Sequence, residues 1–596
     1  MDAHPRTPRP GAHAAPALTP GAALGPYDPP MHLPPRLQHY GHTALRDDLV
    51  AAFIVAVLLI PQSLAYALLA GLPPQAGVYA SLLPLLAYAA LGSSHVNSVG
   101  PAAVLSLLTA QGMAGAVAHH GVSPADAALV MAVEVGALLG AAAVIKLDAL
   151  SALLSVPVLQ GFSIGAAVSI ALSQLPVLLG SPAQGFNAQQ VASSWWRSNV
   201  PGHAATTAFG LGALGLLLLA RRHAAPLASR WLTAGQASLL SRCVPLALIL
   251  VGILLGGLVS AGDRGVALVG ALPAFALSFT PPPWGAALWR ELLPSSAIVA
   301  LVTFVSSLAV AESLGLQQGT PVSARRELTG LAAANLVAGL SGGMPVGGSF
   351  SRTAVNIEAG VRTRMAGVWT ALFMALAMLL FAGPLSQLPK AVLAATIVVA
   401  VLASAEWRAV LDAWRFARSE AAVMVSVAAI TVFHDALWAL ATGVGVSIAL
   451  LLQRSARPHA VLVGRMPGTE HYRNVLRYPA VLEPTVLGLR IDESLLFTNA
   501  RQLPGVVASH LDKHPDTVRV LLQMSPVNRI DFSGLAALRS LQDILAKRGV
   551  QLDLSEVKGP VLDQLRQSGW SQWFTGRLFL SHHQGVVGRQ GMPPGG

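Results

Sequence analysis

Charged residues are scarce in this chain. Only 11% of its 596 residues are charged, whereas 54% are hydrophobic. Soluble globular domains carry about 25% charged residues, so the composition excludes an ordinary soluble protein and indicates a polytopic membrane protein. The formal net charge is +11, but the basic residues lie mainly in short loops between apolar segments. That placement is typical of membrane orientation signals, so we expect no nucleic acid partner.

Cysteine and catalytic motifs are also nearly absent. The single cysteine, Cys243, excludes a disulfide within the chain and any cysteine-rich metal site. The sequence contains no Walker motif, no metal-ligand cluster and no nucleophile paired with a base. It therefore predicts no enzyme, no metal site and no cofactor. The first long apolar run begins only at Leu49, and we predict no cleavable signal peptide.

Composition divides the chain into four regions. Residues 1–45 are rich in Pro, Ala and His and are expected to be disordered and cytoplasmic. Residues 46–453 are almost continuously apolar and form the expected membrane domain. Residues 454–585 have the charge content of a soluble domain, and the Gly/Pro-rich tail at 586–596 is expected to be disordered.

The soluble region has the pattern of a small α/β domain. Its strand-like runs are at 485–491, 518–524 and 550–557, and an amphipathic helical stretch at 533–549 lies between the last two. The order strand, helix, strand is typical of α/β domains.

Fourteen membrane spans are predicted in the apolar region. They lie near residues 48–69, 76–92, 100–116, 124–145, 151–179, 205–220, 241–260, 296–317, 328–341, 349–361, 365–383, 389–404, 420–433 and 435–453. The loops after the sixth, eighth, tenth, twelfth and fourteenth spans are basic, with Arg221, Arg222 and Arg230 following the sixth. The opposite loops carry only scattered basic residues, so the positive-inside rule places both termini in the cytoplasm.

Two of these spans begin at a glycine-rich break and are too short to cross a membrane alone. They contain VGPAAVLSLL at 99–108 and GGSFSRTAVN at 347–356, one in each half of the membrane domain. A spanning helix needs about 20 apolar residues. Two half-helices can point their positive N-terminal ends at one central spot, and such a spot suits an anion.

The residues at these two helix starts are candidate binding residues. Gly100 and Ala102 flank Pro101, which we expect in the first turn of the first half-helix, where its missing N–H is no loss. Ser349 or Ser351 is expected to cap the second half-helix by accepting a hydrogen bond from its free N–H groups.

Arg352 adds a full positive charge at the second helix start, beside Phe350. An arginine inside an apolar segment is rarely tolerated without a partner. That partner is either a bound anion or a carboxylate of the chain, for example Glu358 or Glu312.

Polar residues in two other spans allow a functional or a structural interpretation. Gln62 and Tyr66 are four residues apart in the first span and share a helix face, which either lines a cavity or forms hydrogen bonds between helices. Glu312 lies near the cytoplasmic end of the eighth span. It is either a functional intramembrane carboxylate or a residue that reaches water or pairs with Arg325 or Arg326.

The chain resembles the sulfate permease (SulP) family of anion transporters. The resemblance is carried by IPQSLAYALLAGLPPQAGVYASLLPLLAYAALGSSHVNSVGPAAV at 60–104, and by residues 325–367 and 388–401 in the second half. The soluble region resembles a STAS domain, the module shared with anti-sigma-factor antagonists. The resemblance covers residues 45–580. It implies a polytopic α-helical membrane protein with 14 spans in a seven-plus-seven inverted repeat, a core domain that moves against a gate domain, and a small cytoplasmic α/β STAS domain.

The resemblance also implies which residues contact the anion. It places the face of Gln62 and Tyr66 at the substrate site. Family members have a basic residue facing the anion, which corresponds here to Arg352, and we expect Ser351 and the neighbouring backbone N–H groups to contact the anion as well.

Coupling to a cation is expected to be weak or absent. Many bacterial family members have an acidic residue two places after the residue that matches Phe304, and this chain has Ser306 there. The resemblance therefore implies a neutral Ser306 at the substrate site and favours anion exchange. Glu312 remains the candidate coupling residue.

In the soluble region, IDFSGLAAL at 530–538 resembles the STAS phosphoacceptor loop, with Ser533 at the phosphorylatable place. A phosphate at a helix N-terminus is stabilised by the helix end. The structural alternative is an N-cap serine, with Asp531 stabilising the turn.

The sequence thus predicts a secondary transporter of a small inorganic or carboxylate anion in the bacterial inner (plasma) membrane. Sulfate, bicarbonate, chloride and dicarboxylates are all candidates, and the mechanism would be alternating access. The alternatives are a passive anion channel and a membrane sensor whose STAS domain binds a regulatory protein. The expected partners are the anion, membrane lipid, a second copy of the chain in a homodimer and a regulatory protein at the STAS domain.

Overall fold

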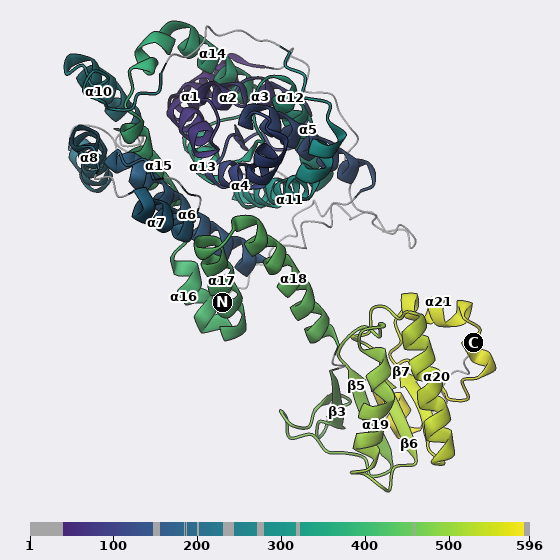
Figure 1. Cartoon of the computed structure of the whole chain (residues 1–596). Coiled ribbons are helices and arrows are strands. Elements are labelled where there is room, and N and C mark those ends of the chain that lie inside the picture. Colours follow the sequence, from purple (N-terminus) through teal and green to yellow (C-terminus); the bar gives the residue numbers. More distant parts are fainter. Residues whose placement is uncertain are drawn as a thin grey trace, which may run out of the picture. The chain divides into compact units, whose positions relative to one another are not determined.

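The structure is a computed structural model that describes residues 40–146, 155–183, 185, 187–198, 202–230, 244–270, 279–317, 322–456 and 459–588. The chain divides into two compact units, with the boundary between Gly443 and Val444. The first unit is mainly helical, and the second, which begins within helix α18 (Ala436–Ser455), is a sheet with helices (Figure 1). The regions expected to be disordered lie largely outside the described residues.

The helices of the first unit follow the order predicted for the fourteen spans. The first half contains α1 (His42–Leu69), α2 (Pro74–Tyr79), α3 (Leu83–Leu91), α4 (Ala103–His120), α5 (Pro124–Val144), α6 (Val156–Leu179), α7 (Ala188–Ser198), α8 (Ala204–Ala228) and α10 (Val244–Leu258). The second half contains α11 (Ala286–Gln317), α12 (Ala324–Leu340), α13 (Phe350–Glu358), α14 (Met365–Ser386), α15 (Lys390–Ser404), α16 (Arg408–Phe416), α17 (Arg418–Phe433) and α18 (Ala436–Ser455). Each predicted span matches one helix, except that the second span is divided into α2 and α3.

The helices of the structure differ in several ways from the spans predicted by counting apolar runs. Nine helices in the described ranges are long and apolar enough to cross a membrane. Helix α13, with nine residues, is not among them and extends only about 14 Å, as expected for a half-helix. The short helices α7 and α16 were missed because their apolar residues occupy only one face. Helix α1 begins at His42, six residues before the predicted start of the first span.

Packing sorts the membrane helices into two bundles. Helices α1–α5 and α11–α14 pack on one another and form what we call the core bundle, and helices α6–α8, α10 and α15–α17 form the gate bundle. Figure 1 shows the helices of the core bundle in a compact cluster, with the gate helices beside it. The bundles meet where α1 packs against α10 and α15, and where α4 packs against α6. Each bundle therefore combines helices from both halves of the chain.

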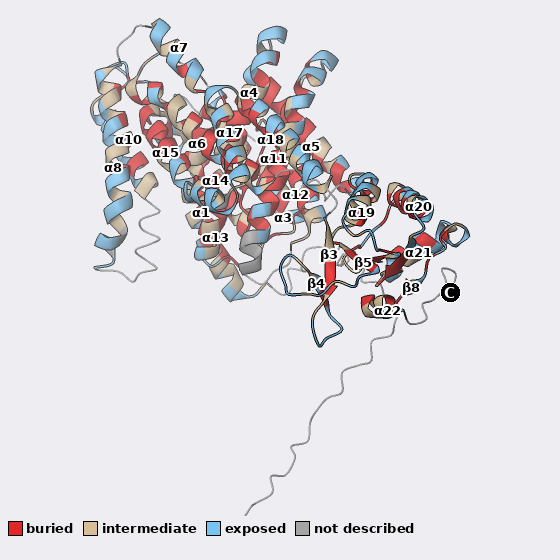
Figure 2. Cartoon of the chain, turned by 90° about the horizontal axis from the view of Figure 1, so that it is seen from below, coloured by how far each residue is buried: buried red, intermediate tan, exposed pale blue. Residues whose placement is uncertain are grey.

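Burial differs widely among the membrane helices. In the apolar stretch of α5, 67% of the residues are buried, compared with 22% in α8. Figure 2 shows about half of α12 in the buried colour, whereas α8 is mostly exposed or intermediate. The apolar outer surface of α8 is consistent with contact with lipid, because a membrane-spanning helix has no need to hide apolar side chains from its surroundings.

Within residues 459–588 the second unit forms a six-stranded sheet in the order β4-β3-β5-β6-β7-β8. The strands are β3 (Ala460–Arg465), β4 (Tyr472–Asn474), β5 (Val486–Ile491), β6 (Arg519–Gln523), β7 (Gln551–Ser555) and β8 (Leu578–Phe579), and the α-helices are α19 (Leu503–Leu511), α20 (Phe532–Lys547), α21 (Gly559–Gln567) and α22 (His582–Val587). Strands β5 to β8 are parallel, and β3 is antiparallel to β4 and β5. The three predicted strands correspond to β5, β6 and β7, and the predicted helix to α20. The apolar side chains of these elements form the core of the unit.

Candidate functional site

The two glycine-rich breaks of the sequence lie against each other. Each contains a two-residue strand, β1 (Val99–Gly100) and β2 (Gly347–Gly348), and the two strands pair antiparallel with Gly100 opposite Gly347. This pairing brings together the segments that lead into α4 and α13. The two half-helices, one from each half of the chain, therefore start at one place inside the core bundle.

The starts of the half-helices differ in detail from the prediction. Ala102 is the N-cap of α4 and remains extended, so Pro101 lies before the helix and not in its first turn. Ser349 is the N-cap of α13, but its side chain accepts no capping hydrogen bond. Ser351 lies inside the helix and is not the cap. The side chains of Phe350 and Ser351 are outside the described part of the structure.

Arg352 is buried in the first turn of α13, with 1% exposure. Its Nη1 donates hydrogen bonds to the carbonyl oxygen of Pro101 at 2.8 Å and to Oε1 of Gln62 at 3.3 Å. Its Nε and Nη2 have no hydrogen-bond partner among the described residues. The structural alternative, an ion pair with Glu358 or Glu312, is not found among these residues either. A buried guanidinium is costly unless it is paired, so this arrangement is chemically suited to binding an anion.

A cavity of about 140 Å³ lies where the core bundle faces the gate bundle. Gln62 and Tyr66 line it from α1, as expected from their shared helix face, and Gln62 is also the acceptor of the buried arginine. Arg221 of α8 and Thr396 of α15 line the cavity from the gate bundle. Arg221 was predicted to lie in a cytoplasmic loop, whereas α8 continues past it. Movement of one bundle against the other would change the shape of this cavity.

Glycine is needed at the strand pair because other groups approach the backbone closely. A Cβ atom on Gly348 would lie 2.6 Å from Oδ1 of Asn97, which is too close for any side chain. A Cβ atom on Gly100 would lie 3.5 Å from Nη2 of Arg352. The backbone of Gly100 therefore lies next to the buried guanidinium, with room only for an ordinary van der Waals contact between them.

Helix α11 contacts the strand pair through Ser307. The buried Ser307 Oγ accepts a hydrogen bond from the backbone N–H of Gly348 at 2.7 Å. The Oγ of Ser306, the residue that the resemblance singled out, donates to the carbonyl oxygen of Val302 in its own helix at 2.6 Å. The two neighbouring serines of α11 thus have different partners. The hydroxyl of Ser307 binds the backbone of β2, whereas the hydroxyl of Ser306 binds a carbonyl oxygen of its own helix.

Glu327 of α12 is a fully buried carboxylate that was not predicted as a site residue. It accepts hydrogen bonds from Oη of Tyr88 at 2.5 Å, from N and Oγ of Ser93 at 3.2 and 2.9 Å, and from Nδ2 of Asn97 at 3.0 Å. Oδ1 of Asn97 in turn accepts from Oγ1 of Thr353 on α13 at 3.4 Å. The carboxylate therefore joins the segment before β1 to α12 and, through Asn97, to the second half-helix. The predicted ninth span began at residue 328, which left Glu327 in a loop.

Two further carboxylates of the membrane helices have no contact with the strand pair. Glu312 is exposed on α11. Glu134 of α5, to which the sequence assigned no role, is 4% exposed, and its Oε2 has no hydrogen-bond partner among the described residues. Neither carboxylate contributes a hydrogen bond to Arg352 or to the paired strands.

In the second unit, Ser533 is the second residue of α20 and is half-buried. The N-cap is Asp531, whose Oδ1 accepts from the N–H of Gly534 at 2.9 Å and whose Oδ2 accepts from the N–H of Phe497 at 2.7 Å. The alternative interpretation of Ser533 as the N-cap is therefore wrong, although Asp531 does stabilise the turn. Phosphorylation of Ser533 stays a prediction.

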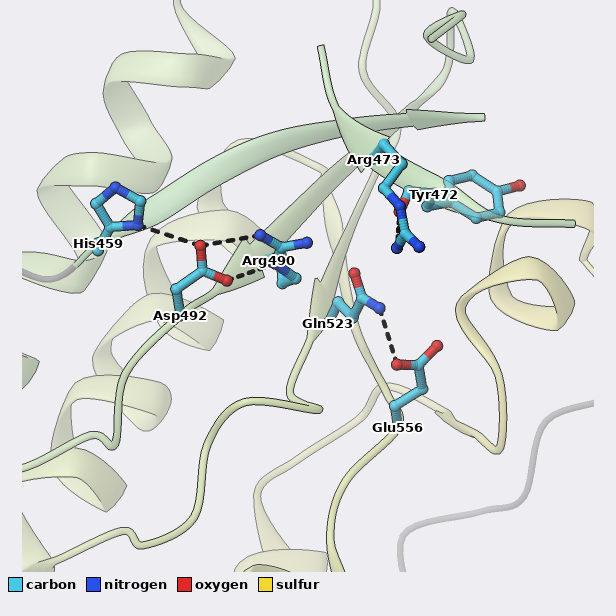
Figure 3. A network of polar contacts seen from close by, with 7 residues as sticks. All are labelled: His459, Tyr472, Arg473, Arg490, Asp492, Gln523 and Glu556. Atoms are coloured by element: carbon cyan, nitrogen blue, oxygen red, sulfur yellow. Dashed lines mark hydrogen bonds and ion pairs between the residues drawn. The ribbon is translucent and has the colours of Figure 1, made fainter. Parts of the chain in front are cut away.

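A polar cavity of about 610 Å³ opens at the carboxyl ends of β5, β6 and β7, the edge at which parallel sheets commonly bind ligands. Figure 3 shows two of its acidic side chains engaged by neighbours: Asp492 accepts from Arg490 at 3.1 Å, and Glu556 accepts from Gln523 at 2.8 Å. Burial raises the pKa of Asp492, but the hydrogen bonds and charges of Arg490 and His459 together lower it below its ordinary value. Arg473 donates to the backbone carbonyl of Tyr472. The lining thus carries both acidic and basic side chains and does not select a class of ligand.

The sequence of the first unit matches a known family. Residues 45–427 match the sulfate permease family, and residues 478–585 match the STAS domain. The chain belongs to the sulfate permease family. Similar sulfate permease proteins include probable sulfate transporter 4.2 of Arabidopsis thaliana, 31% identical over 564 residues that cover 90% of this chain and 80% of the relative. A probable sulfate transporter of Mycobacterium tuberculosis is 31% identical over 533 residues, which cover 89% of this chain and 92% of the relative.

Solved structures share the sulfate permease fold. The murine solute carrier 26 family member A9 anion transporter in the inward-facing state has a TM-score of 0.79 at 22% identity, and the match covers 92% of each chain. The transmembrane domain of a cyanobacterium bicarbonate transporter has a TM-score of 0.57 at 20% identity, with 67% of this chain and 98% of that chain covered. The predicted family and fold are confirmed: the chain is a multi-pass membrane anion transporter with a STAS domain, and members of its family are transporters, not enzymes.

Proposed function

We propose that this chain is a secondary transporter that carries a small inorganic or carboxylate anion across the membrane by alternating access. The anion binds between the β1–β2 strand pair and the N-terminal ends of α4 and α13. Arg352 supplies the positive charge, and Gln62 and Tyr66 border the site on the side of the cavity. Movement of the core bundle against the gate bundle then exposes the site to the other side of the membrane.

The observation that carries this proposal is the buried guanidinium of Arg352, with two nitrogens that have no partner among the described residues. It lies at the start of one half-helix and bonds the carbonyl oxygen of Pro101, just before the other. Each helix N-terminus behaves as about half a positive charge. Three sources of positive potential therefore converge on one buried place, which favours an anion and disfavours a cation.

Relatives of the chain are named as sulfate transporters, and one structural neighbour is named as a bicarbonate transporter. Both anions fit a site made of a guanidinium and helix ends, and so do chloride and dicarboxylates. We therefore propose the class of small anions as substrate, with sulfate and bicarbonate as the first members to measure.

Exchange of anions is the proposed mode of transport. A proton-coupled carrier needs a group that titrates near the working pH, and a sodium-coupled carrier usually needs a carboxylate to offset desolvation of the cation. Ser306 has no charge, and its hydroxyl is already bonded within α11. Glu312 remains the candidate for residual coupling to a cation.

The distribution of basic loops supports a further part of the proposal. Both termini would lie in the cytoplasm of a bacterium, with the chain in the inner membrane. A homodimer with contacts through the STAS domain, and a regulatory protein that acts on this domain near Ser533, complete the proposed assembly.

Replacement of Arg352 tests the site directly. We expect Arg352→Ala to weaken anion affinity roughly 10- to 100-fold, because charge-assisted hydrogen bonds contribute about 1.5–3 kcal/mol. Arg352→Lys should be intermediate, since the charge remains but the planar fork does not. The matched control is Arg362→Ala, which removes a 60% exposed arginine ten residues further along. If Arg352→Ala binds and takes up the anion as the unmodified protein does, the proposed binding site is wrong.

Uptake into proteoliposomes tests the mechanism. Gradients of sodium, protons and counter-anion are imposed one at a time, with a panel of labelled anions outside. Acceleration by internal anion alone is expected for exchange. Acceleration by an inward proton or sodium gradient that is lost in Glu312→Gln would assign coupling to Glu312 instead, and unitary currents that reverse at the anion equilibrium potential would establish a channel.

A further inference from the structure

Helix α16 presents an apolar face that no other part of the described chain covers. Leu411 and Trp414 belong to the helix, and Trp407 is its N-cap and has helical dihedral angles. Because the three residues are spaced by four and three positions, they lie on one side of the helix. They are 46%, 61% and 58% exposed, and no residue of the helix is buried. Phe416, at the end of the helix, is 84% exposed.

A polar face adjoins this apolar face. Arg408, Asp412 and Arg415 have the same spacing as the apolar set but are displaced by one residue, which corresponds to about 100° around the helix axis. The guanidinium of Arg418, just beyond the helix, lies 5.9 Å from the ring centre of Trp414. Helix α16 is thus amphipathic, with cationic side chains beside its aromatic face.

The connections of α16 hold it close to the membrane. With nine residues it is about 14 Å long and too short to cross the bilayer. It follows α15 after the three residues 405–407 and is separated from α17 by the single extended residue Ala417. Three residues reach at most about 11 Å. The helix therefore cannot move far from the surface at which α15 ends and α17 begins.

We propose that α16 lies in the interface of the lipid bilayer and binds phospholipid. Trp407, Leu411 and Trp414 would contact the acyl chains, while Arg408 and Arg415 would reach the phosphate groups. Amphipathic helices with Trp and Leu on one face and Arg on the other adopt this position, and tryptophan is enriched at membrane interfaces. Phospholipid is favoured over a second copy of the chain because the connections to α15 and α17 bring lipid to this face in every copy of the protein.

This contact has a consequence for the gate bundle. Helix α15 lines the cavity with Thr396, Ile397, Ala400 and Ala403, and α16 begins shortly after its last residue. An interfacial α16 therefore holds this end of α15 at a constant depth in the bilayer. The gate bundle would therefore keep its position relative to the bilayer while the core bundle moves.

The test uses the full chain in vesicles of phosphatidylcholine and phosphatidylglycerol. Cys243 is the only cysteine, so Cys243→Ala provides a background in which one nitroxide label is attached at Leu411→Cys or at Asp412→Cys. These neighbouring positions lie on the apolar and the polar face, so each is a matched control for the other. Labels at Val425→Cys, 51% exposed on α17, and at Leu476→Cys, 90% exposed in the second unit, serve as references for lipid and water.

Power saturation measures collisions of each label with oxygen, which concentrates in lipid, and with a nickel chelate, which remains in water. We expect the ratio of oxygen to nickel accessibility at Leu411→Cys to exceed that at Asp412→Cys several-fold and to approach the value at Val425→Cys. Only variants with the gel-filtration profile and anion uptake of the background are compared, which confines the result to folded protein. Equal nickel accessibility at both positions would refute the proposal. Exclusion of both reagents from Leu411→Cys, together with short label–label distances, would refute it in favour of a contact between two copies.

Discussion

Glu327 offers the sharpest test of how the anion site is held in shape. Its carboxylate accepts from Tyr88, Ser93 and Asn97, and Asn97 lies against the backbone of Gly348. Leaving a buried donor unpaired costs about 1–3 kcal/mol. Glu327→Ala leaves the donors of three residues without an acceptor and should therefore destabilise the membrane unit by at least about 3 kcal/mol. Glu327→Gln keeps the shape and one acceptor oxygen and should cost only about 1–3 kcal/mol.

The milder variant separates positioning from stability. In Glu327→Gln the guanidinium of Arg352 and the two helix ends are still present, but the segment before β1 is held less firmly. We expect anion affinity to weaken about 10-fold, equivalent to about 1.4 kcal/mol, while the rate of uptake at saturating anion changes much less. Tyr88→Phe should reproduce part of this loss. Both changes act on one network of hydrogen bonds, so the effect of the double variant should differ from the sum of the effects of the two single variants.

The measurements are the thermal midpoint in detergent, the midpoint shift produced by added anion, and the concentration dependence of uptake into proteoliposomes. Asp263→Asn, a change at an exposed carboxylate in the turn after α10, is the control and should change none of them. A lower midpoint with unchanged anion affinity would show that Glu327 acts only on stability. If both the thermal midpoint and the anion affinity are unchanged, the hydrogen bonds of Glu327 contribute neither to stability nor to the shape of the site.

Three further predictions address other parts of the chain. Gly348→Ala should weaken anion affinity and lower the thermal midpoint, because its Cβ would lie 2.6 Å from Oδ1 of Asn97, whereas Gly383→Ala, with open space around it, should do neither. Burial lowers the pKa of His582 from 6.5 to about 4, so the unfolded chain binds the proton first. The free energy of unfolding of the STAS domain should then fall by at most about 3 kcal/mol between pH 6.5 and pH 4, and urea unfolding of His582→Gln should not show this fall. Ser306→Glu should introduce a dependence of uptake on an imposed proton gradient, and a profile as flat as that of the parent would contradict the proposed position of Ser306.

The sequence by itself determined the order of the membrane helices. A span needs about 20 apolar residues and a basic loop marks its cytoplasmic end, and both signals are local properties of composition. The two half-helices followed from the same argument, because each apolar run is interrupted by glycine after too few residues. Arg352 could likewise be singled out from the cost of one arginine in an apolar segment. In the STAS domain, the short spacing of strand, helix and strand was sufficient to predict β5, β6, α20 and β7.

Only the tertiary structure decided which residues meet. The pairing of Val99 and Gly100 with the strand at Gly347, and the hydrogen bond between Asn97 and Glu327, 230 residues away, join the two halves of the chain. Hydropathy cannot foresee such contacts, since a charged or polar group is acceptable in a membrane wherever its partners lie in space. For this reason Glu327 and Arg221 resembled loop residues in the sequence, although one is buried beside the strand pair and the other lines the cavity. The orientation of each helix, which local composition does not encode, made that difference.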